Sequence, residues 1–316
     1  MRVLVTGGTG GVGARVTARL LERGDEVLVL TRDAGRARAV LEPRVAIVEG
    51  DPSHAGSWQD VVASCDGVVH LAAQSIWGRR WSAREKTLIR TSRVEATTRV
   101  AEAVARGRGR VALVSASAVG QYYGAHGDEP VGDDGGRAAS GASGASFIAS
   151  VCADWEGACA PALEAGARVS YARIGVVTSS AVGMMAPPFR GFLGGVPGSG
   201  TQWVPWVDPR DLADMLLFAL TCPELSGPFN AVGPAPVRMR ELAQTLGRVL
   251  GRPVWAPLPG FVVEGVLGEV ACMALLGARA LPEKLERLGF RHTHVDLEAA
   301  LRDAVAGPRL PGSHEA

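Results

Sequence analysis

The chain has 316 residues, of which 47% are hydrophobic and 21% are charged, with 33 basic side chains against 32 acidic ones. These proportions are typical of folded globular chains and argue against disordered or fibrous architectures. The formal net charge of +1 provides no field that would gather nucleic acid or an anionic membrane surface. We therefore expect a small-molecule substrate, and neither a nucleic acid nor a membrane, as the partner.

The cysteines form an odd set without a C-x-x-C pair, at Cys65, Cys152, Cys159, Cys222 and Cys272. This spacing predicts neither a disulfide framework nor a zinc site, so we expect no metal. No secretion signal is visible at the start of the chain, and a cytoplasmic location fits best. The stretch from 261 to 281 is apolar, but two glutamates interrupt it, which favours a buried or interface helix over a membrane span.

The first half of the chain alternates short apolar runs with helical periodicity, the pattern of a parallel sheet covered on both faces. Strands are expected at 2–6, 26–31, 44–49, 67–71, 110–115 and 168–174. Beyond about residue 176 glycine and proline increase, and helices are expected at 209–221, 238–250, 260–277 and 282–288, the first of them capped by Asp208. The predicted fold class is α/β, a Rossmann doubly wound parallel sheet with a smaller, mainly helical C-terminal substrate lobe.

This pattern divides the chain into a dinucleotide-binding domain and a substrate lobe. We assign residues 1–176 to the Rossmann domain and 177–306 mostly to the lobe, with segments such as 204–232 returning to the Rossmann core. The Gly- and Ser-rich segment 132–146 is expected to form a mobile loop, and 307–316 a flexible tail. A homodimer through helices such as 92–106 is compatible with the pattern.

The sequence TGGTGGVG at 6–13 directly follows the first predicted strand and opens the first predicted helix. In this context Gly7 permits a tight turn, Gly10 lets the backbone approach a pyrophosphate, and Gly13 allows close helix-to-strand packing. The free N–H groups of a helix N-terminus face the anion. We expect the cofactor contacts of this turn to come from Gly7, Thr9, Gly10, Gly11, Val12 and Gly13.

The end of the second strand indicates which dinucleotide binds. NAD-binding versions of this motif place an acid there for the ribose 2′-hydroxyl, but this chain has Thr31 followed by Arg32. A cation favours a 2′-phosphate, so Arg32 predicts NADP(H). Further contacts are expected from the ends of the third, fourth and fifth strands, at Asp51 near the adenine, Leu71, Ala72 and Ala73 beside the ribose, and Ser115.

Several motifs together resemble the extended and atypical short-chain dehydrogenase/reductase superfamily. They are the glycine turn, HLAA at 70–73 and the Ser-rich fifth strand. The segments RRWSAREKTLIRTSRV, VCADWE, PPFRGFLGG, GSGTQWVPW and LPEKLERLGF narrow the resemblance to one branch. That branch contains sugar-nucleotide-epimerase-like proteins, often misnamed cell-division inhibitors, with a small C-terminal domain.

The resemblance implies a catalytic Ser or Thr after the fifth strand and a Tyr-x-x-x-Lys pair that exchanges a proton with the substrate. Ser117 fills the first role. The pair falls on Phe147 and Val151, as is general in this branch, and neither side chain can donate a proton. Tyr122 and Tyr123 are the nearest alternative acids, although this aromatic turn can also be structural.

Other polar residues have weaker claims to the site. His70 is expected to pack near the cofactor, and His292 and His294 have no clustered acid or cysteine that would complete a metal site. Trp203, Trp206 and Arg190 are candidates to line a substrate cleft or to pack between the lobes.

The leading hypothesis is therefore an NADP(H)-dependent oxidoreductase or epimerase that moves a hydride to or from a small carbonyl or hydroxyl substrate. The missing Tyr and Lys leave two alternatives open. One is a non-redox isomerase, dehydratase or cyclase with a structural or recycled dinucleotide. The other is a catalytically idle NADP(H) sensor.

Overall fold

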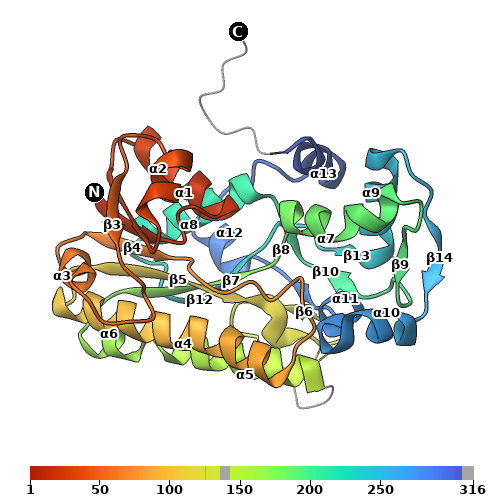
Figure 1. Cartoon of the computed structure of the whole chain (residues 1–316), viewed down its shortest axis with the longest axis horizontal. Helices are drawn as coiled ribbons and strands as arrows, with labels where there is room; N and C mark the ends of the chain where they lie inside the picture. Colours follow the sequence, from red (N-terminus) through yellow and green to blue (C-terminus); the bar gives the residue numbers. More distant parts are fainter. Residues whose placement is uncertain (125, 136–142, 308–316) are drawn as a thin grey trace, which may run out of the picture.

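A computed structural model describes residues 1–124, 126–135 and 143–307 and is built around one seven-stranded parallel sheet (Figure 1). The strand order is β12-β7-β5-β4-β1-β2-β3, which confirms the predicted Rossmann class. The strands are β1 (Arg2–Thr6), β2 (Glu26–Thr31), β3 (Ala46–Glu49), β4 (Gly67–His70), β5 (Ala112–Ala118), β7 (Val169–Ile174) and β12 (Gly227–Ala231).

Helices cover both faces of this sheet (Figure 1). One face carries α1 (Gly11–Glu22), α2 (Ala34–Val40) and α8 (Pro209–Thr221), and the other carries α3 (Trp58–Ala63), α4 (Ala83–Arg106), α5 (Ser143–Gly157) and α6 (Ala160–Glu164). Successive strand residues point to opposite faces. Val3 and Val5 accordingly join the core beneath α1 and α8, whereas Leu4 joins the core beneath α4. Continuous apolar runs are therefore required in these strands.

The C-terminal lobe lies beside the carboxyl edge of the sheet (Figure 1). Its helices are α7 (Thr178–Arg190), α9 (Met239–Leu250), α10 (Gly260–Leu267), η2 (Gly268–Ala271), α11 (Cys272–Leu275) and α13 (Leu297–Ala306). Helix α12 (Glu283–Arg287) packs instead against β12 of the sheet, where Leu285 joins the core beneath α1 and α8. Short strands form two-stranded pairs, β10 (Trp203–Val204) with β13 (Val237–Arg238), β11 (Trp206–Val207) with β8 (Val176–Val177), β14 (Trp255–Leu258) with β9 (Gly195–Pro197), and β15 (Arg279–Ala280) with β6 (Pro130–Val131). A 3-10 turn, η1 (Val119–Tyr122), follows β5.

The structure differs from the predicted elements in three places. β12 adds a seventh strand, paired in parallel with β7. Helix α7 forms although Pro187 and Pro188 lie inside it. The helix expected over 260–277 is split into α10, η2 and α11, and Gly268 at the break has a φ of +64°. A positive φ interrupts the helix, and glycine adopts it without the clash that a Cβ would cause.

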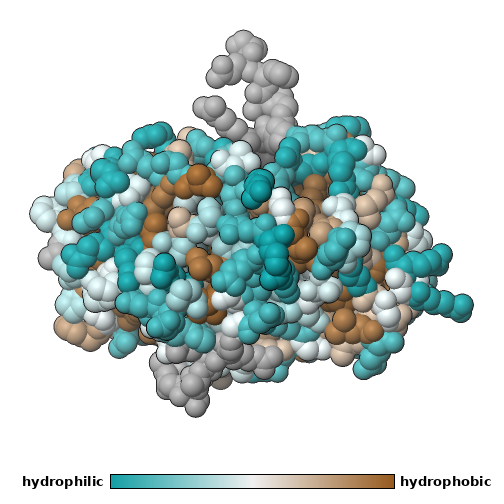
Figure 2. Space-filling view, turned by 180° about the vertical axis from the view of Figure 1, so that it is seen from behind, coloured by the Kyte–Doolittle hydropathy of each residue, from teal (hydrophilic) through white to brown (hydrophobic). Residues whose placement is uncertain are grey.

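The outer surface is mostly polar. Figure 2 shows hydrophobic side chains in small groups among hydrophilic ones on the rear face. Within the described ranges no helix combines the length and the apolar character that a membrane crossing requires. Residues 136–142 of the loop predicted at 132–146, and all of the predicted tail after Gly307, lie outside the described residues, whereas 143–146 form the start of α5 and not a loop.

Candidate functional site: a dinucleotide cradle beside an apolar cavity

The turn between β1 and α1 is held by close backbone approach. Gly7 has a φ of +70°, and a Cβ there would lie 3.0 Å from both Ala72 N and Leu71 C. A Cβ on Gly13 would lie 2.8 Å from Gly7 C and Gly8 Cα, and closer still to the Gly7 oxygen. The distances at Gly13 are shorter than real Cβ contacts. Those at Gly7 are tighter than most, and its positive φ also disfavours a side chain, so the turn favours glycine at both positions.

The first turn of α1 is suited to an anion. Its N-cap is Gly10, no side chain caps the helix, and the first turn contains no acidic residue. The N–H groups of Gly11, Val12 and Gly13 therefore have no partner inside the helix. Thr9 and Val12 are half-buried beside this turn, whereas Gly10 and Gly11 are exposed. The arrangement offers backbone donors and the positive end of a helix dipole to a phosphate group. We call this turn, residues 6–13, the cradle.

The carboxyl ends of β2 and β3 bring two predicted cofactor residues together. Arg32 Nη1 lies 3.9 Å from Asp51 Oδ2, and the Arg32 side chain is 76% exposed. The guanidinium is therefore free to bind a second anion at this edge of the cradle. Leu71 and Ala72 are half-buried, and Ala73 is exposed at the end of β4. Ser115 is 1% exposed, and its hydroxyl donates to the Ala116 carbonyl oxygen within the fold.

The buried side chain of His70, at the end of β4, connects β1 to α4 below the cradle. The Thr6 hydroxyl lies 2.7 Å from His70 Nδ1, and it accepts the N–H groups of Leu71 and Ala72 at 3.1 Å. His70 Nε2 lies 3.0 Å from the Thr97 hydroxyl. Complete burial lowers the pKa of His70 to about 4. The ring is therefore neutral at pH 7 and fixes the strand ends that support the cofactor.

Ser117 lies inside β5, which extends further than predicted, and it joins a buried ion pair. The Glu156 and Arg173 side chains are 10% and 9% exposed, and Arg173 donates to both carboxylate oxygens at 2.9 Å. Burial opposes the charge of Arg173, but hydrogen bonds to Glu156 outweigh it and raise the pKa of the guanidinium. Ser117 Oγ donates to Glu156 Oε1 at 2.7 Å. Its hydroxyl is thus committed to a structural partner.

The two tyrosines after β5 have different surroundings. Tyr122 is fully buried, accepts a hydrogen bond from Arg173 Nη1 at 2.6 Å and donates to Asn230 Oδ1 at 3.2 Å. Burial raises the pKa of Tyr122 to about 12. Tyr123 is 3% exposed, its hydroxyl has no hydrogen-bond partner among the described residues, and burial also raises its pKa. Only Tyr123 of the pair lines the cavity described below.

The positions of the expected Tyr-x-x-x-Lys pair lie on α5. Phe147 packs edge-on against Trp81 with ring centroids 5.4 Å apart, and Lys86 Nζ lies 5.2 Å from the Phe147 centroid. Lys86 also pairs with Glu269 of η2 at 2.6 Å. Val151 is 2% exposed in the same cluster. These contacts bind α5 to α4 and to the C-terminal lobe.

A cavity of about 810 Å³ opens where the carboxyl ends of β4 and β5 meet the C-terminal lobe. Trp77–Arg80, which follow β4, and Tyr123 line the side nearest the cradle, and α7 and α10 form much of the rest. Trp203 lines the cavity. Trp206 is 2% exposed in the core and Arg190 is exposed at the end of α7, and neither belongs to the lining.

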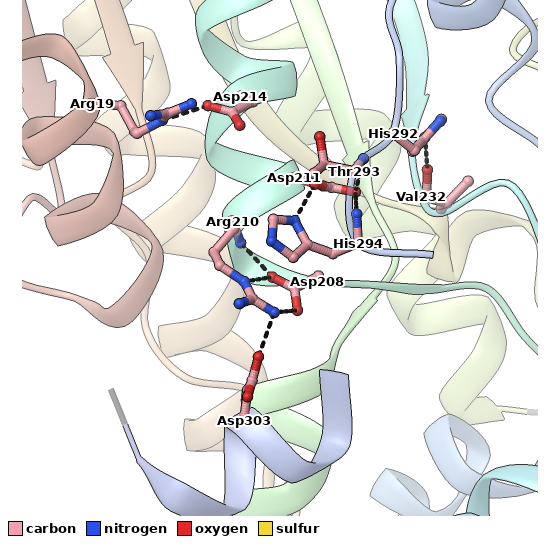
Figure 3. Close-up of polar contacts among 10 residues, drawn as sticks. All are labelled: Arg19, Asp208, Arg210, Asp211, Asp214, Val232, His292, Thr293, His294 and Asp303. Carbon is pink, nitrogen blue, oxygen red and sulfur yellow. Dashed lines mark hydrogen bonds and ion pairs between the residues drawn. The ribbon is translucent and has the colours of Figure 1, made fainter. Parts of the chain in front are cut away.

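A polar cluster at the start of α8 joins this helix to α13 and to residues 293–294 (Figure 3). Asp208 is the N-cap of α8, as predicted, and accepts the Arg210 N–H at 2.8 Å. The Arg210 guanidinium binds both Asp208 and Asp303 of α13 at 2.8 Å. Arg19 of α1 pairs with Asp214 of α8 at 2.7 Å. The cluster fixes how α8 packs on its neighbours.

In the same cluster Asp211 and His294 contact each other, whereas His292 has a different partner (Figure 3). Asp211 accepts the N–H groups of Thr293 and His294, and its Oδ1 lies 2.6 Å from His294 Nδ1. His292 Nε2 lies 3.1 Å from the Val232 carbonyl oxygen. Within the described residues no group of three or more His, Cys, Asp or Glu side chains is arranged to hold a metal ion.

Sequence reasoning missed the residues that organise this region. Arg173 and Asn230 are polar side chains inside otherwise apolar strands, and each needs a buried partner. That signal was available for Arg173, but it does not identify Glu156 as the partner. Asp133, 4% exposed, accepts the N–H groups of Asn230 at 2.5 Å and Lys284 at 2.7 Å. The start of the loop expected at 132–146 is therefore anchored.

Family models match both parts of the chain. The NAD dependent epimerase/dehydratase family matches residues 3–140, and a domain of unknown function, DUF1731, matches residues 258–304. The first match contains the cradle and the strand ends, and the second contains α10 through most of α13. Fold and cradle together define an epimerase-type member of the short-chain dehydrogenase/reductase superfamily with an added C-terminal domain.

Relatives align with almost the whole chain. The chain is 38% identical to the chloroplastic SDR39U1 homolog of Arabidopsis thaliana, over 96% of this chain and 86% of that one. It is 39% identical to an epimerase family protein of Mycobacterium tuberculosis, over 97% and 98%. The crystal structure of human SDR39U1 (isoform 2) with NADPH has a TM-score of 0.80 and 31% identity, over 98% and 100%. The chain therefore belongs to the SDR39U1 epimerase family.

Proposed function

We propose that this protein is an NADP(H)-dependent oxidoreductase or epimerase whose residues 1–176 bind the dinucleotide and whose C-terminal lobe selects the substrate. The observation that carries the proposal is the cradle, in which Gly7 and Gly13 have no room for a side chain and α1 presents uncapped N–H groups. The exposed guanidinium of Arg32 at the end of β2 supports a 2′-phosphate. The NADPH held by the human relative agrees with this preference.

The adjoining cavity supports hydride chemistry on a carbonyl or hydroxyl group. When bound, the dinucleotide would supply or accept the hydride. In the reductive direction the hydride adds to the carbonyl carbon, the C=O π electrons move to oxygen, and that oxygen takes a proton. Tyr123 is the candidate donor because the residue lines the cavity, and because its hydroxyl is protonated at pH 7 and has no hydrogen-bond partner among the described residues. Water would then return a proton to the phenolate.

Ser117 and Tyr122 have a structural role in this proposed site and do not transfer the proton. Their hydroxyls bind Glu156, Arg173 and Asn230, which fixes the end of β5 from which Tyr123 extends. We assign them to positioning of Tyr123. Proton transfer in the site then depends on one phenol, where the superfamily uses a Ser, a Tyr and a Lys.

The proposal is tested by identifying the dinucleotide released from freshly purified protein and by titrating NADPH and NADH. Arg32→Ala should weaken NADPH binding at least tenfold and leave NADH binding almost unchanged, because only the 2′-phosphate contact is lost. Arg44→Ala is the matched control, since Arg44 is an exposed arginine at the amino end of β3 that pairs with Glu42. Equal NADPH affinity in the two variants contradicts the role of Arg32. NADP(H) that binds but is never consumed with any carbonyl favours the non-redox or sensor alternatives.

A further inference from the structure

The chemistry of the cavity lining indicates the class of substrate. Among its described lining residues there is no Asp, Glu, Asn, Gln, Ser, Thr or His. The lining is instead formed mainly by aliphatic, aromatic and thioether side chains, and four of them are methionines, at 184, 185, 239 and 273. Methionine is flexible and polarizable, and it adapts to apolar ligands of varied shape. We propose that the cavity binds a substrate with a large apolar body and a single oxygen function, such as a long-chain or polycyclic aldehyde, ketone or alcohol.

A nucleotide sugar does not match this lining. Its diphosphate and sugar hydroxyls would lose water, and each polar group buried without a new hydrogen bond costs several kcal/mol, roughly 2–7 by transfer measurements. Among the described lining residues the cations are Arg79 and Arg80, which follow β4, and each already has a protein partner. Arg79 donates to Glu85 at 3.2 Å, and Arg80 donates to the carbonyl oxygens of Gly265 and Val266 at the end of α10.

The polar atoms that remain lie close to the cradle or have partners. Trp203 Nε1 donates to Asp128 at 3.0 Å, which leaves the Tyr123 hydroxyl and the Trp77 indole N–H on the side near β4 and β5. A substrate oxygen would therefore be held beside Tyr123, where the proposed hydride transfer takes place. The apolar body would extend from there between α7 and α10.

The mouth of the cavity supports the same class of ligand. Leu193 and Val266 belong to the lining, yet they are 74% and 68% exposed. Leu258, also in the lining, is 37% exposed. Apolar side chains that border a cavity and face water are typical of ligand-binding surfaces. A long apolar ligand would cover them, and burial of each additional methylene would contribute to affinity.

The inference rests on the proposed function, and its test separates the two. The NADPH-loaded full-length protein is first titrated with the neutral fluorescent probe N-phenyl-1-naphthylamine. Butanal, hexanal, octanal, decanal and UDP-glucose are then each tested for their ability to displace the probe. We expect affinity to increase with chain length by up to about fourfold per methylene, which corresponds to about 0.8 kcal/mol each. UDP-glucose should displace nothing. NADPH consumption should follow the same order of aldehydes.

Met184→Glu places a charge in the lining and should weaken probe and decanal binding at least tenfold without changing NADPH affinity. Ser180→Glu is the matched control, because Ser180 is exposed on the same helix and does not line the cavity. Val266→Glu, at the exposed mouth, provides a second test if the first variant unfolds. Unchanged decanal binding in both cavity variants, or displacement of the probe by UDP-glucose, overturns the inference. Absence of NADPH binding in the wild type instead overturns the proposed function.

Discussion

The sharpest test of the cradle is the substitution Gly13→Ala. The added Cβ would lie 2.8 Å from Gly7 C and Gly8 Cα and would overlap the Gly7 oxygen. These neighbours are backbone atoms of the turn itself, so relief requires a movement of about 1 Å between β1 and α1. Overpacking of this kind costs roughly 1–3 kcal/mol, while alanine in a helix gains about 1 kcal/mol over glycine. We therefore expect a modest loss of stability and a much larger loss of NADPH affinity, at least a hundredfold, because the displaced N–H groups no longer meet the pyrophosphate.

The matched control is Gly157→Ala, at the end of α5, where a Cβ would meet nothing within 4 Å. This variant should bind NADPH as the wild type does and should unfold at the same or a slightly higher urea concentration. Fluorescence titration gives the affinities, and urea unfolding without cofactor gives the free energies of unfolding. Wild-type NADPH affinity in Gly13→Ala would refute the idea that close packing of α1 against the turn forms the phosphate site.

Three other predictions follow from buried groups. Tyr123→Phe should reduce turnover about 10²–10⁴-fold with little change in stability, as expected for loss of a general acid. Tyr122→Phe should instead destabilise the fold by about 1–3 kcal/mol, because Arg173 loses a buried partner. Equal turnover losses in the two variants would contradict this division of roles. Arg173→Met should cost about 3–5 kcal/mol in urea unfolding, since Glu156 is left buried without its cation, and adding Glu156→Leu should recover part of that loss. Burial lowers the pKa of His70 to about 4, so the unfolded chain binds a proton at this residue before the folded protein does as the pH falls. The contribution of the neutral ring to the free energy of unfolding should be complete above pH 6.5 and about 3 kcal/mol lower at pH 4. His70→Asn should reduce this dependence of the free energy of unfolding on pH.

Most strands of the sheet were predictable because they are covered on both faces and consist largely of apolar residues. The exception is β12, whose sequence GPFNA contains a glycine, a proline and a polar side chain. Tertiary contacts stabilise it, since Asn230 Nδ2 donates to the carbonyl oxygens of Val131 and Leu281. Helix α7 was missed because two prolines normally end a helix, yet both lie in its last turn. That helix forms a wall of the cavity, so the sequence did not reveal where the C-terminal lobe is hollow.

The cradle could be predicted in detail because its function depends on backbone geometry, which glycine spacing records directly. The roles that we propose for Ser117, Tyr122 and Tyr123 depend on contacts between strands and helices far apart in the sequence. Ser117 and Glu156 are 39 residues apart, and Tyr122 and Arg173 are 51 apart. Nothing in the local pattern distinguishes a serine that faces a substrate from one that faces a buried carboxylate. The sequence therefore predicted the glycine turn that the structure contains, but not the contacts that distinguish Ser117, Tyr122 and Tyr123.

In the mechanism that we propose, the buried ion pair positions the proton donor in a chain that lacks the Tyr-x-x-x-Lys pair. A catalytic phenol needs a fixed position more than it needs a particular neighbour, because misplacement by about 1 Å can cost a hundredfold in rate. Here Arg173 binds Glu156 and Tyr122 at once, which links α5, β7 and the turn after β5 into one rigid unit. Tyr123 is the next residue, so its direction is determined by that unit. In the superfamily a lysine lowers the pKa of the catalytic tyrosine. In the mechanism proposed for this protein, the charged groups Glu156 and Arg173 instead hold the backbone that positions Tyr123 beside the cavity.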